Sequence, residues 1–151
     1  MSNENIYQPR MMNTLSETVR IKVRFSEVDS IQMVWHGNYV QYLEDAREAW
    51  GRKYGLEYMH IYRSGYLAPM YDLKLQYKQT ATIDDVLIVS ITYRPERGAK
   101  LIFDYEIHRE TDHALILTAT TTQLFTTQDG VLEPSCPSFL KEWKEKNHVV
   151  C

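Results

Sequence analysis

An acid, a histidine and an amide side chain lie close together in the sequence, where the first strand-like stretch gives way to the longest helix-like stretch. They are Asp29, His36 and Asn38. A carboxylate can attack a carbonyl carbon or activate a water molecule. Backbone N–H groups at a helix start have no intrahelical partners and can stabilise an oxyanion. Together these groups suit acyl transfer to water, a reaction that requires no metal.

Each of these residues also has an ordinary structural interpretation. An aspartate at the end of a strand is most often a turn or cap residue, and a histidine beside a helix start most often makes a structural hydrogen bond. Asn38 has the residue type of a helix N-cap, and Gln41 three residues later would complete a variant of the capping box. Residue types and spacing alone therefore leave the function undecided.

Two elements would position these residues. Residues 19–25 alternate between apolar and polar side chains, which predicts a strand with one apolar face. From Asn38 onward, apolar residues recur at helical spacing up to Gly55, which has the residue type of a helix C-terminal stop. We expect the polar residues of this helix, among them Glu44 and Arg47, to fill the face opposite to the apolar one.

Four more strands and a short helix follow. We expect strands at 66–79, 86–93, 101–107 and 114–127, a helix at 137–146, and a short helix or irregular segment at 56–65. Tight turns between the strands indicate an α+β fold with an antiparallel five-stranded sheet and one long helix. The strand at 86–93 is apolar at nearly every position, and a strand that is apolar on both faces needs cover on both. Because one helix covers only one face, we expect a second subunit over the other face or an edge.

Size and composition suit one domain. The chain has 151 residues, of which 44% are hydrophobic and 25% charged. We expect a flexible N-terminal tail at 1–16 and a single domain at 17–151. The net charge of −3 gives no reason to expect nucleic acid as a partner, and no apolar stretch is long enough for membrane insertion.

The remaining metal-binding and redox residue types suggest no cofactor. The histidines His108 and His113 complete no ligand spacing with carboxylates, so we expect no metal. The chain starts with polar residues rather than with the apolar core of a secretory signal. We therefore expect a cytoplasmic protein in which Cys136 and Cys151 stay reduced thiols.

Three segments resemble a known signature: Val23-Arg-Phe-Ser-Glu-Val-Asp29, Met33-Val-Trp-His-Gly-Asn-Tyr39 and Tyr42-Leu-Glu-Asp-Ala-Arg47. The signature is that of the hotdog-fold acyl-CoA thioesterases, in their 4-hydroxybenzoyl-CoA thioesterase and YbgC-like branch. The resemblance implies a hotdog fold, in which the sheet wraps around one long central helix. It also implies hydrolysis of acyl-CoA or acyl carrier protein thioesters to acid and thiol, with no cofactor beyond the coenzyme A of the substrate. Relatives form homodimers or homotetramers with active sites between subunits.

The resemblance also assigns roles to individual residues. Asp29 matches the catalytic carboxylate, as nucleophile or general base. The backbone N–H around His36 matches the group that polarises the thioester carbonyl, and the His36 side chain matches a histidine that positions substrate or handles protons. Residues on the substrate side would be Trp35, Asn38, Tyr39 and Glu44. Arg94 and Arg97, beside the turn at 95–98, could contact the phosphates of coenzyme A, although a solvated turn is the simpler interpretation.

One departure from the signature bears on function. Ile31 and Gln32 stand where many relatives have glycine or another small residue, which would affect substrate preference first and activity second. This departure keeps a non-catalytic acyl-thioester binding module as an alternative. A hydroxyacyl-thioester dehydratase on the same fold is a further alternative, but the position of Asp29 argues against it.

Overall fold

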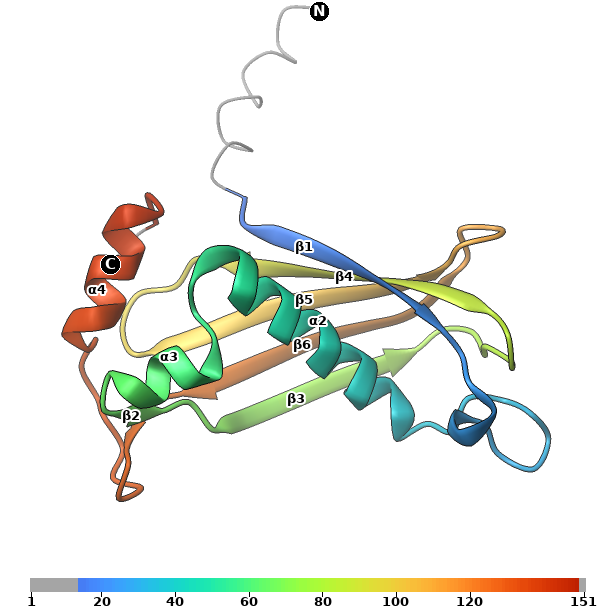
Figure 1. The fold of residues 1–151 in the computed structure, drawn as a ribbon, viewed down its shortest axis with the longest axis horizontal. Coiled ribbons are helices and arrows are strands. Elements are labelled where there is room, and N and C mark those ends of the chain that lie inside the picture. Colours follow the sequence, from blue (N-terminus) through green and yellow to red (C-terminus); the bar gives the residue numbers. More distant parts are fainter. Residues whose placement is uncertain (1–13, 150–151) are drawn as a thin grey trace, which may run out of the picture.

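A five-stranded antiparallel sheet curves around one long helix, α2 (Asn38–Tyr54), in the computed structural model, which describes residues 14–149 (Figure 1). The strand order is β1-β4-β5-β6-β3. The strands are β1 (Ser16–Lys22), β3 (Met70–Tyr77), β4 (Val86–Arg94), β5 (Lys100–Arg109) and β6 (Leu115–Leu124). This confirms the predicted α+β arrangement of five antiparallel strands around one central helix.

Shorter elements close the end of the molecule where α2 stops. They are the helices α3 (Tyr58–Arg63) and α4 (Ser138–Lys146) and the paired two-residue strands β2 (Tyr66–Leu67) and β7 (Thr126–Thr127). The predicted strands at 66–79 and 114–127 are thus each interrupted once. Most of the predicted tail at 1–16, and Cys151, lie outside the described residues. No helix within residues 14–149 is long and apolar enough to cross a membrane.

The core lies between α2 and the concave face of the sheet. Its centre is Trp50, which is fully buried and has ring centroids 4.7 to 5.8 Å from those of four aromatic neighbours. The Nε1–H of Trp50 donates to the carbonyl of Leu15 at 3.1 Å, so the indole also holds the start of β1.

Arg47 was predicted on the polar face but is only 1% exposed. It lies four residues after the buried Leu43 and three before Trp50, so helical geometry places it on the buried face.

The first strand ends earlier than the alternation predicts. β1 stops at Lys22, and Phe25 lies instead in the 3-10 turn η2 (Phe25–Glu27), where it is 76% exposed. The carboxylate of Glu27 accepts the Arg24 N–H at 2.9 Å and also pairs with the Arg24 guanidinium at 3.0 Å. This local contact turns the chain out of the sheet, which is why the alternating pattern does not continue as a strand.

Asn38 is not the N-cap that its residue type predicts. It is already the first helical residue, and Gly37 before it occupies the cap position without a side-chain hydrogen bond. The Trp35 ring packs over Gly37 so closely that a Cβ there would lie 2.1 Å from it. The Asn38 N–H donates to the Trp35 carbonyl at 2.8 Å, so the chain is helical one residue earlier than expected. At the other end Gly55 stops the helix as predicted, with a left-handed φ of 75°.

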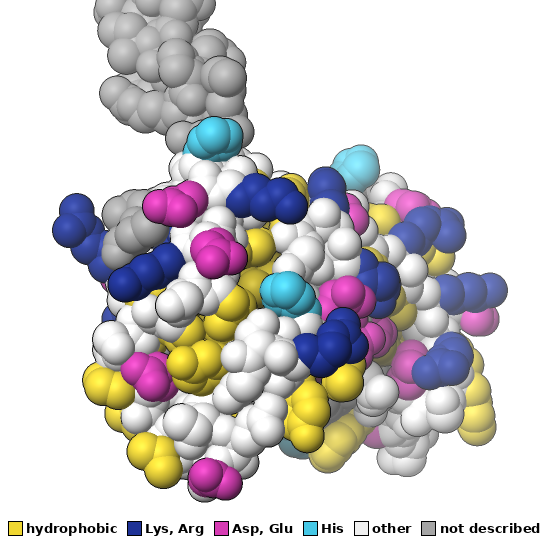
Figure 2. Space-filling model, turned by 60° about the vertical axis from the view of Figure 1, so that its left-hand side comes forward, with side chains coloured by type: hydrophobic (Ala, Val, Ile, Leu, Met, Phe, Trp, Pro, Cys, Tyr) yellow, Lys and Arg dark blue, Asp and Glu magenta, His cyan; other side chains and the backbone are white. Residues whose placement is uncertain are grey.

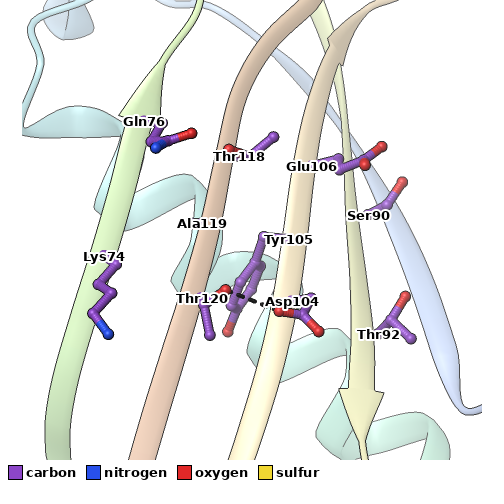
Figure 3. A pocket seen from close by; sticks show the side chains of 10 residues that line it. All are labelled: Lys74, Gln76, Ser90, Thr92, Asp104, Tyr105, Glu106, Thr118, Ala119 and Thr120. Atoms are coloured by element: carbon purple, nitrogen blue, oxygen red, sulfur yellow. Dashed lines mark hydrogen bonds between the residues drawn. The ribbon is translucent and has the colours of Figure 1, made fainter.

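The face of the sheet that points away from α2 is polar (Figure 3). The side chains on its three central strands include Ser90, Thr92, Asp104, Glu106, Thr118 and Thr120, which line a hollow of about 640 Å³. On β4 only Val86 and Ile88 add apolar surface here, because Leu87, Val89, Ile91 and Tyr93 face the helix. The premise that β4 is apolar on both faces was therefore wrong, and this face gives no argument for a covering subunit.

We predict that Trp50→Ala lowers the free energy of unfolding by about 3–5 kcal/mol, since it empties the centre of the core. The matched control is Trp35→Ala, which removes the same side chain from a site that is 51% exposed and should cost no more than about 1 kcal/mol. Urea unfolding followed by far-UV circular dichroism measures both. Equal losses in the two variants would contradict the central role of Trp50.

Candidate active site

Asp29 lies in the loop between η2 and α2, and its carboxylate holds that loop in shape. Its Oδ1 accepts the N–H groups of Ile31 at 3.0 Å and Met33 at 3.1 Å, while its own N–H donates to the Met33 carbonyl at 2.8 Å. The residue is exposed. The structural role that a strand-end aspartate suggests is therefore present, and it also fixes the orientation of the carboxylate.

The unusual pair Ile31-Gln32 forms the tip of this loop. Gln32 has a φ of 65°, in the left-handed region that glycine adopts most easily. A glycine at this position in relatives would thus relieve backbone strain, in addition to being small. Ile31 is 71% exposed, so its side chain points away from the core of its own chain.

His36 lies in the turn that leads into α2. Its carbonyl accepts the hydroxyl of Tyr77, at the end of β3, at 3.0 Å, and its ring is 4.9 Å from that of Trp35. The N–H groups of His36 and Gly37 donate to no acceptor within residues 14–149. Both groups lie at the N-terminal end of α2, where the helix dipole adds a partial positive charge. They are therefore available to an incoming oxygen atom.

A cavity of about 290 Å³ adjoins this turn. Its lining residues are Val34, His36, Tyr39, Tyr77, Lys78, Gln79 and Thr80. The sequence predicts His36 and Tyr39 here but misses the residues of the 77–80 segment. These lie some forty positions away in the sequence. The pairing of β3 with β6 and the backbone contacts of Met33 and Val34 with residues 81–82 bring them to the start of α2. Burial raises the pKa of Tyr39, so its hydroxyl, which is neutral near pH 7 in any case, ionises only at a higher pH than an exposed tyrosine.

The other predicted site residues lie outside this cavity. Asp29 does not line it within one chain. Glu44 is half-buried farther along α2, where it interacts with Tyr58. Arg94 pairs with Asp104, with Nε and Oδ2 3.0 Å apart, and Arg97 is exposed in the turn after β4. The structure thus brings His36 and Tyr39 together, but not Asp29 or the two arginines.

A buried carboxylate that the sequence did not single out connects the site loop to α2. Glu27 is 7% exposed and accepts the hydroxyl of Tyr42 at 2.9 Å, and its carbonyl accepts the Trp35 N–H at 3.0 Å. Burial alone would raise the pKa of Glu27. The hydrogen bonds from the Arg24 N–H, the Tyr42 hydroxyl and the Arg24 guanidinium outweigh burial, so this pKa lies below its ordinary value of 4.5.

Within residues 14–149 no three His, Cys, Asp or Glu side chains gather as a metal site requires.

The architecture is that of hotdog-fold thioesterases of known structure. The DHNA-CoA thioesterase from Staphylococcus aureus has a TM-score of 0.78 and 24% identity, over 86% of this chain and 87% of that one. The 4-hydroxybenzoyl CoA thioesterase from Pseudomonas sp. strain CBS-3 has a TM-score of 0.72 and 24% identity, over 85% of this chain and 98% of that one. At these identities the likeness establishes the fold.

Sequence comparison establishes the family. Residues 23–144 match the family model of the thioesterase-like superfamily, and the chain belongs to this superfamily. It is 26% identical to the acyl-CoA thioesterase YbgC of Haemophilus influenzae over 129 residues, which are 85% of this chain and 91% of that protein. It is 28% identical to the putative acyl-CoA thioesterase YneP of Bacillus subtilis over 88 residues, 58% of this chain and 64% of YneP. The match thus spans just under two-thirds of YneP.

We predict that Glu27→Gln destabilises the protein at pH 7 and that its difference from wild type shrinks as the pH falls below 4.5. A carboxyl group with a lowered folded-state pKa contributes stability above its unfolded pKa, and this contribution is lost as the pH falls through the folded-state value. Urea unfolding between pH 7 and pH 3 measures the difference. Glu142→Gln, an exposed change on α4, is the control. A Glu27→Gln difference that stays constant with pH would contradict the prediction.

Proposed function

We propose that this protein is a thioesterase that hydrolyses acyl-CoA, or acyl carrier protein thioesters, to free acid and thiol. The observation that carries the proposal is the turn before α2, where the N–H groups of His36 and Gly37 lack acceptors within the described residues and His36 lines a cavity. Membership of the thioesterase-like superfamily and the named activity of the YbgC relative support the same reaction.

In the proposed mechanism the thioester carbonyl oxygen accepts the free N–H groups of the turn. They stabilise the negative charge that develops on this oxygen when the carbonyl carbon is attacked, and the loss of one such donor costs about 2.7–4 kcal/mol of barrier in other enzymes. Asp29 either attacks the carbon to form an anhydride or takes a proton from the attacking water. The C–S bond then breaks, and the thiolate leaves and takes up a proton. On the anhydride route, water then attacks the anhydride, which releases the free acid and returns Asp29 to a carboxylate.

A dimer would complete this site, because Asp29 does not line the cavity of its own chain. The edge strand β3 pairs only with β6 and presents large exposed apolar side chains, including Tyr71 at 71% and Leu73 at 38% exposure. Such an edge favours association with another chain. Both edge strands carry charges that oppose pairing, Arg20 and Lys22 on β1 and Asp72 and Lys74 on β3, but β3 also presents the exposed apolar side chains. We therefore propose a homodimer joined along β3, with a homotetramer as a further possibility.

A non-catalytic binding module is the second candidate. It is favoured by the contacts of Asp29, whose Oδ1 already accepts two backbone N–H groups. A carboxylate that serves only to hold its loop would leave a protein that binds acyl thioesters at the turn without hydrolysing them. Assays of binding and of thiol release on the same substrates separate the two candidates.

We predict that wild type releases thiol from members of an acyl-CoA panel and that Asp29→Asn lowers kcat/KM by about 10²- to 10⁴-fold. Asparagine keeps an oxygen that can accept the Ile31 and Met33 N–H groups, so the loop should persist while the charge is lost. Asp129→Asn, in an exposed turn, is the matched control with full activity expected. Full activity of Asp29→Asn would refute the mechanism, and binding by wild type without thiol release would favour the binding module.

The proposed dimer gives a separate prediction. Tyr71→Lys places a charge on the exposed edge of the sheet and should raise the dimer dissociation constant at least tenfold without lowering the stability of the monomer. Analytical ultracentrifugation measures it, and Tyr62→Lys, at an exposed position on α3, is the control. Wild type that is monomeric at tens of micromolar would overturn the dimer.

A further inference from the structure

Arg47, the last residue of the signature segment on α2, has no role in the proposed reaction. Its side chain is buried, and its Nε–H donates to Oε1 of Gln123 at 3.1 Å. The guanidinium carbon lies 4.7 Å from the ring centre of Tyr58, 5.0 Å from that of Phe103 and 5.4 Å from that of Trp50. The two terminal nitrogens, Nη1 and Nη2, are buried and have no hydrogen-bond partner within the described residues.

This arrangement is costly for a protein interior. A buried charge is normally balanced by an opposite charge or by hydrogen bonds to all of its donors. The three aromatic rings attract the cation, but they supply no oxygen acceptors for the four terminal N–H bonds. Burial lowers the pKa of Arg47 accordingly. Glu44 and Glu48 interact with the guanidinium electrostatically, but neither accepts a hydrogen bond from Nη1 or Nη2 within the described residues, so these donors point to an added acceptor.

A cavity of about 260 Å³ lies where such an acceptor would sit, between the second half of α2 and the start of α3. Its lining residues are Arg47, Glu48, Arg52, Glu57, Tyr58 and Met59. Arg47 and Tyr58 both line the cavity and the guanidinium contacts the Tyr58 ring, so the covered terminal nitrogens lie behind this wall and a ligand reaches them when the wall opens. The guanidinium packs closely against Gly51, since a Cβ on this residue would lie 2.9 Å from Nη1. The cavity shares no lining residue with the one at His36.

The surroundings favour one class of ligand. The planar fork of a guanidinium matches the two oxygens of a carboxylate. Two arginines and two glutamates line the cavity, so their formal charges cancel, and a dianion would also face the carboxylates of Glu48 and Glu57. Tyr58 and Met59 offer apolar surface, and Met59, which is 55% exposed, has a flexible side chain that can adapt to a ligand. Figure 2 shows the molecule turned so that the end with α3 and α4 comes forward, with apolar side chains among charges of both signs.

We propose that this cavity is a binding site for a monocarboxylate with a small apolar group, whose two oxygens accept hydrogen bonds from Nη1 and Nη2 of Arg47. Ordered water, or a glutamate of the cavity that swings inward, could satisfy the same donors without any ligand. The three cases differ in whether an added carboxylate binds saturably. That binding can be read without a hydrolysis assay, so the test is independent of the proposed thioesterase activity.

The test titrates the full-length protein with butyrate, with its neutral isostere butyramide and with phosphate, at matched ionic strength in chloride, and follows the melting temperature. Butyrate should raise the melting temperature saturably. At a tenfold excess over its Kd, the ratio of folded to unfolded protein should rise about elevenfold. Butyramide should give no such rise, and phosphate a weaker one than butyrate.

Two variants locate the effect. Arg47→Met removes the fork while keeping an apolar stem and should abolish the response to butyrate. Arg63→Met, at an exposed position on α3 outside the cavity, should keep it. If Arg47→Met does not fold, NMR of wild type with ¹⁵N-labelled arginine takes its place, and the Arg47 resonances should shift with butyrate but not with butyramide. The proposal is overturned if wild type shows no saturable response, if Arg47→Met responds like wild type, if phosphate binds in preference to butyrate, or if the Arg47 resonances do not shift.

Discussion

Burial of one face of α2 against the concave side of the sheet is the constraint on which the rest of the structure depends. Trp50 anchors the second half of the helix to β4, β5 and α4, and through its indole N–H it also holds the residue before β1. The hydrogen bond of Tyr42 to Glu27 ties the first half to the loop of Asp29. With both halves held, the N–H groups of His36 and Gly37, which have no acceptor within residues 14–149, are fixed at the start of the helix beside the cavity that His36 lines. Positioned donors of this kind cost no reorganisation when charge develops on a substrate.

The parts of the fold that were predictable from the sequence are those in which one face of an element is apolar. The period of α2, its end at Gly55 and the five strands follow from such patterns. The conformation of residues that depends on one specific contact could not be predicted from such patterns. Phe25 continues the alternation of β1 in sequence, but the Arg24–Glu27 pair turns the chain away. Asn38 has the residue type of a cap, but the packing of Trp35 over a neighbouring glycine starts the helix earlier.

The residues of the candidate site also fall into those that the sequence predicts and those that it does not. Asp29, His36 and Tyr39 are close in sequence and were proposed from residue type and resemblance. Tyr77 could not be, because its contact with the His36 carbonyl depends on the register between β3 and β6. Arg47 was visible in the signature segment but was placed on the wrong face. A charged residue at an apolar helical position looks like a solvated one until its aromatic neighbours are known.

The start of α2 and the cavity at Arg47, near the middle of the helix, would bind negative charge by different physical means, and this difference separates their proposed roles. At the start of the helix, the donors are backbone N–H groups beside a cavity. They carry only partial positive charges, not a full one. Such donors bind a neutral carbonyl weakly and an oxyanion strongly, which is what catalysis requires. Arg47 carries a full, buried charge in a fixed planar fork. It would hold a permanent anion equally well before and after any reaction, so its geometry suits binding and would add little to the rate of a chemical step.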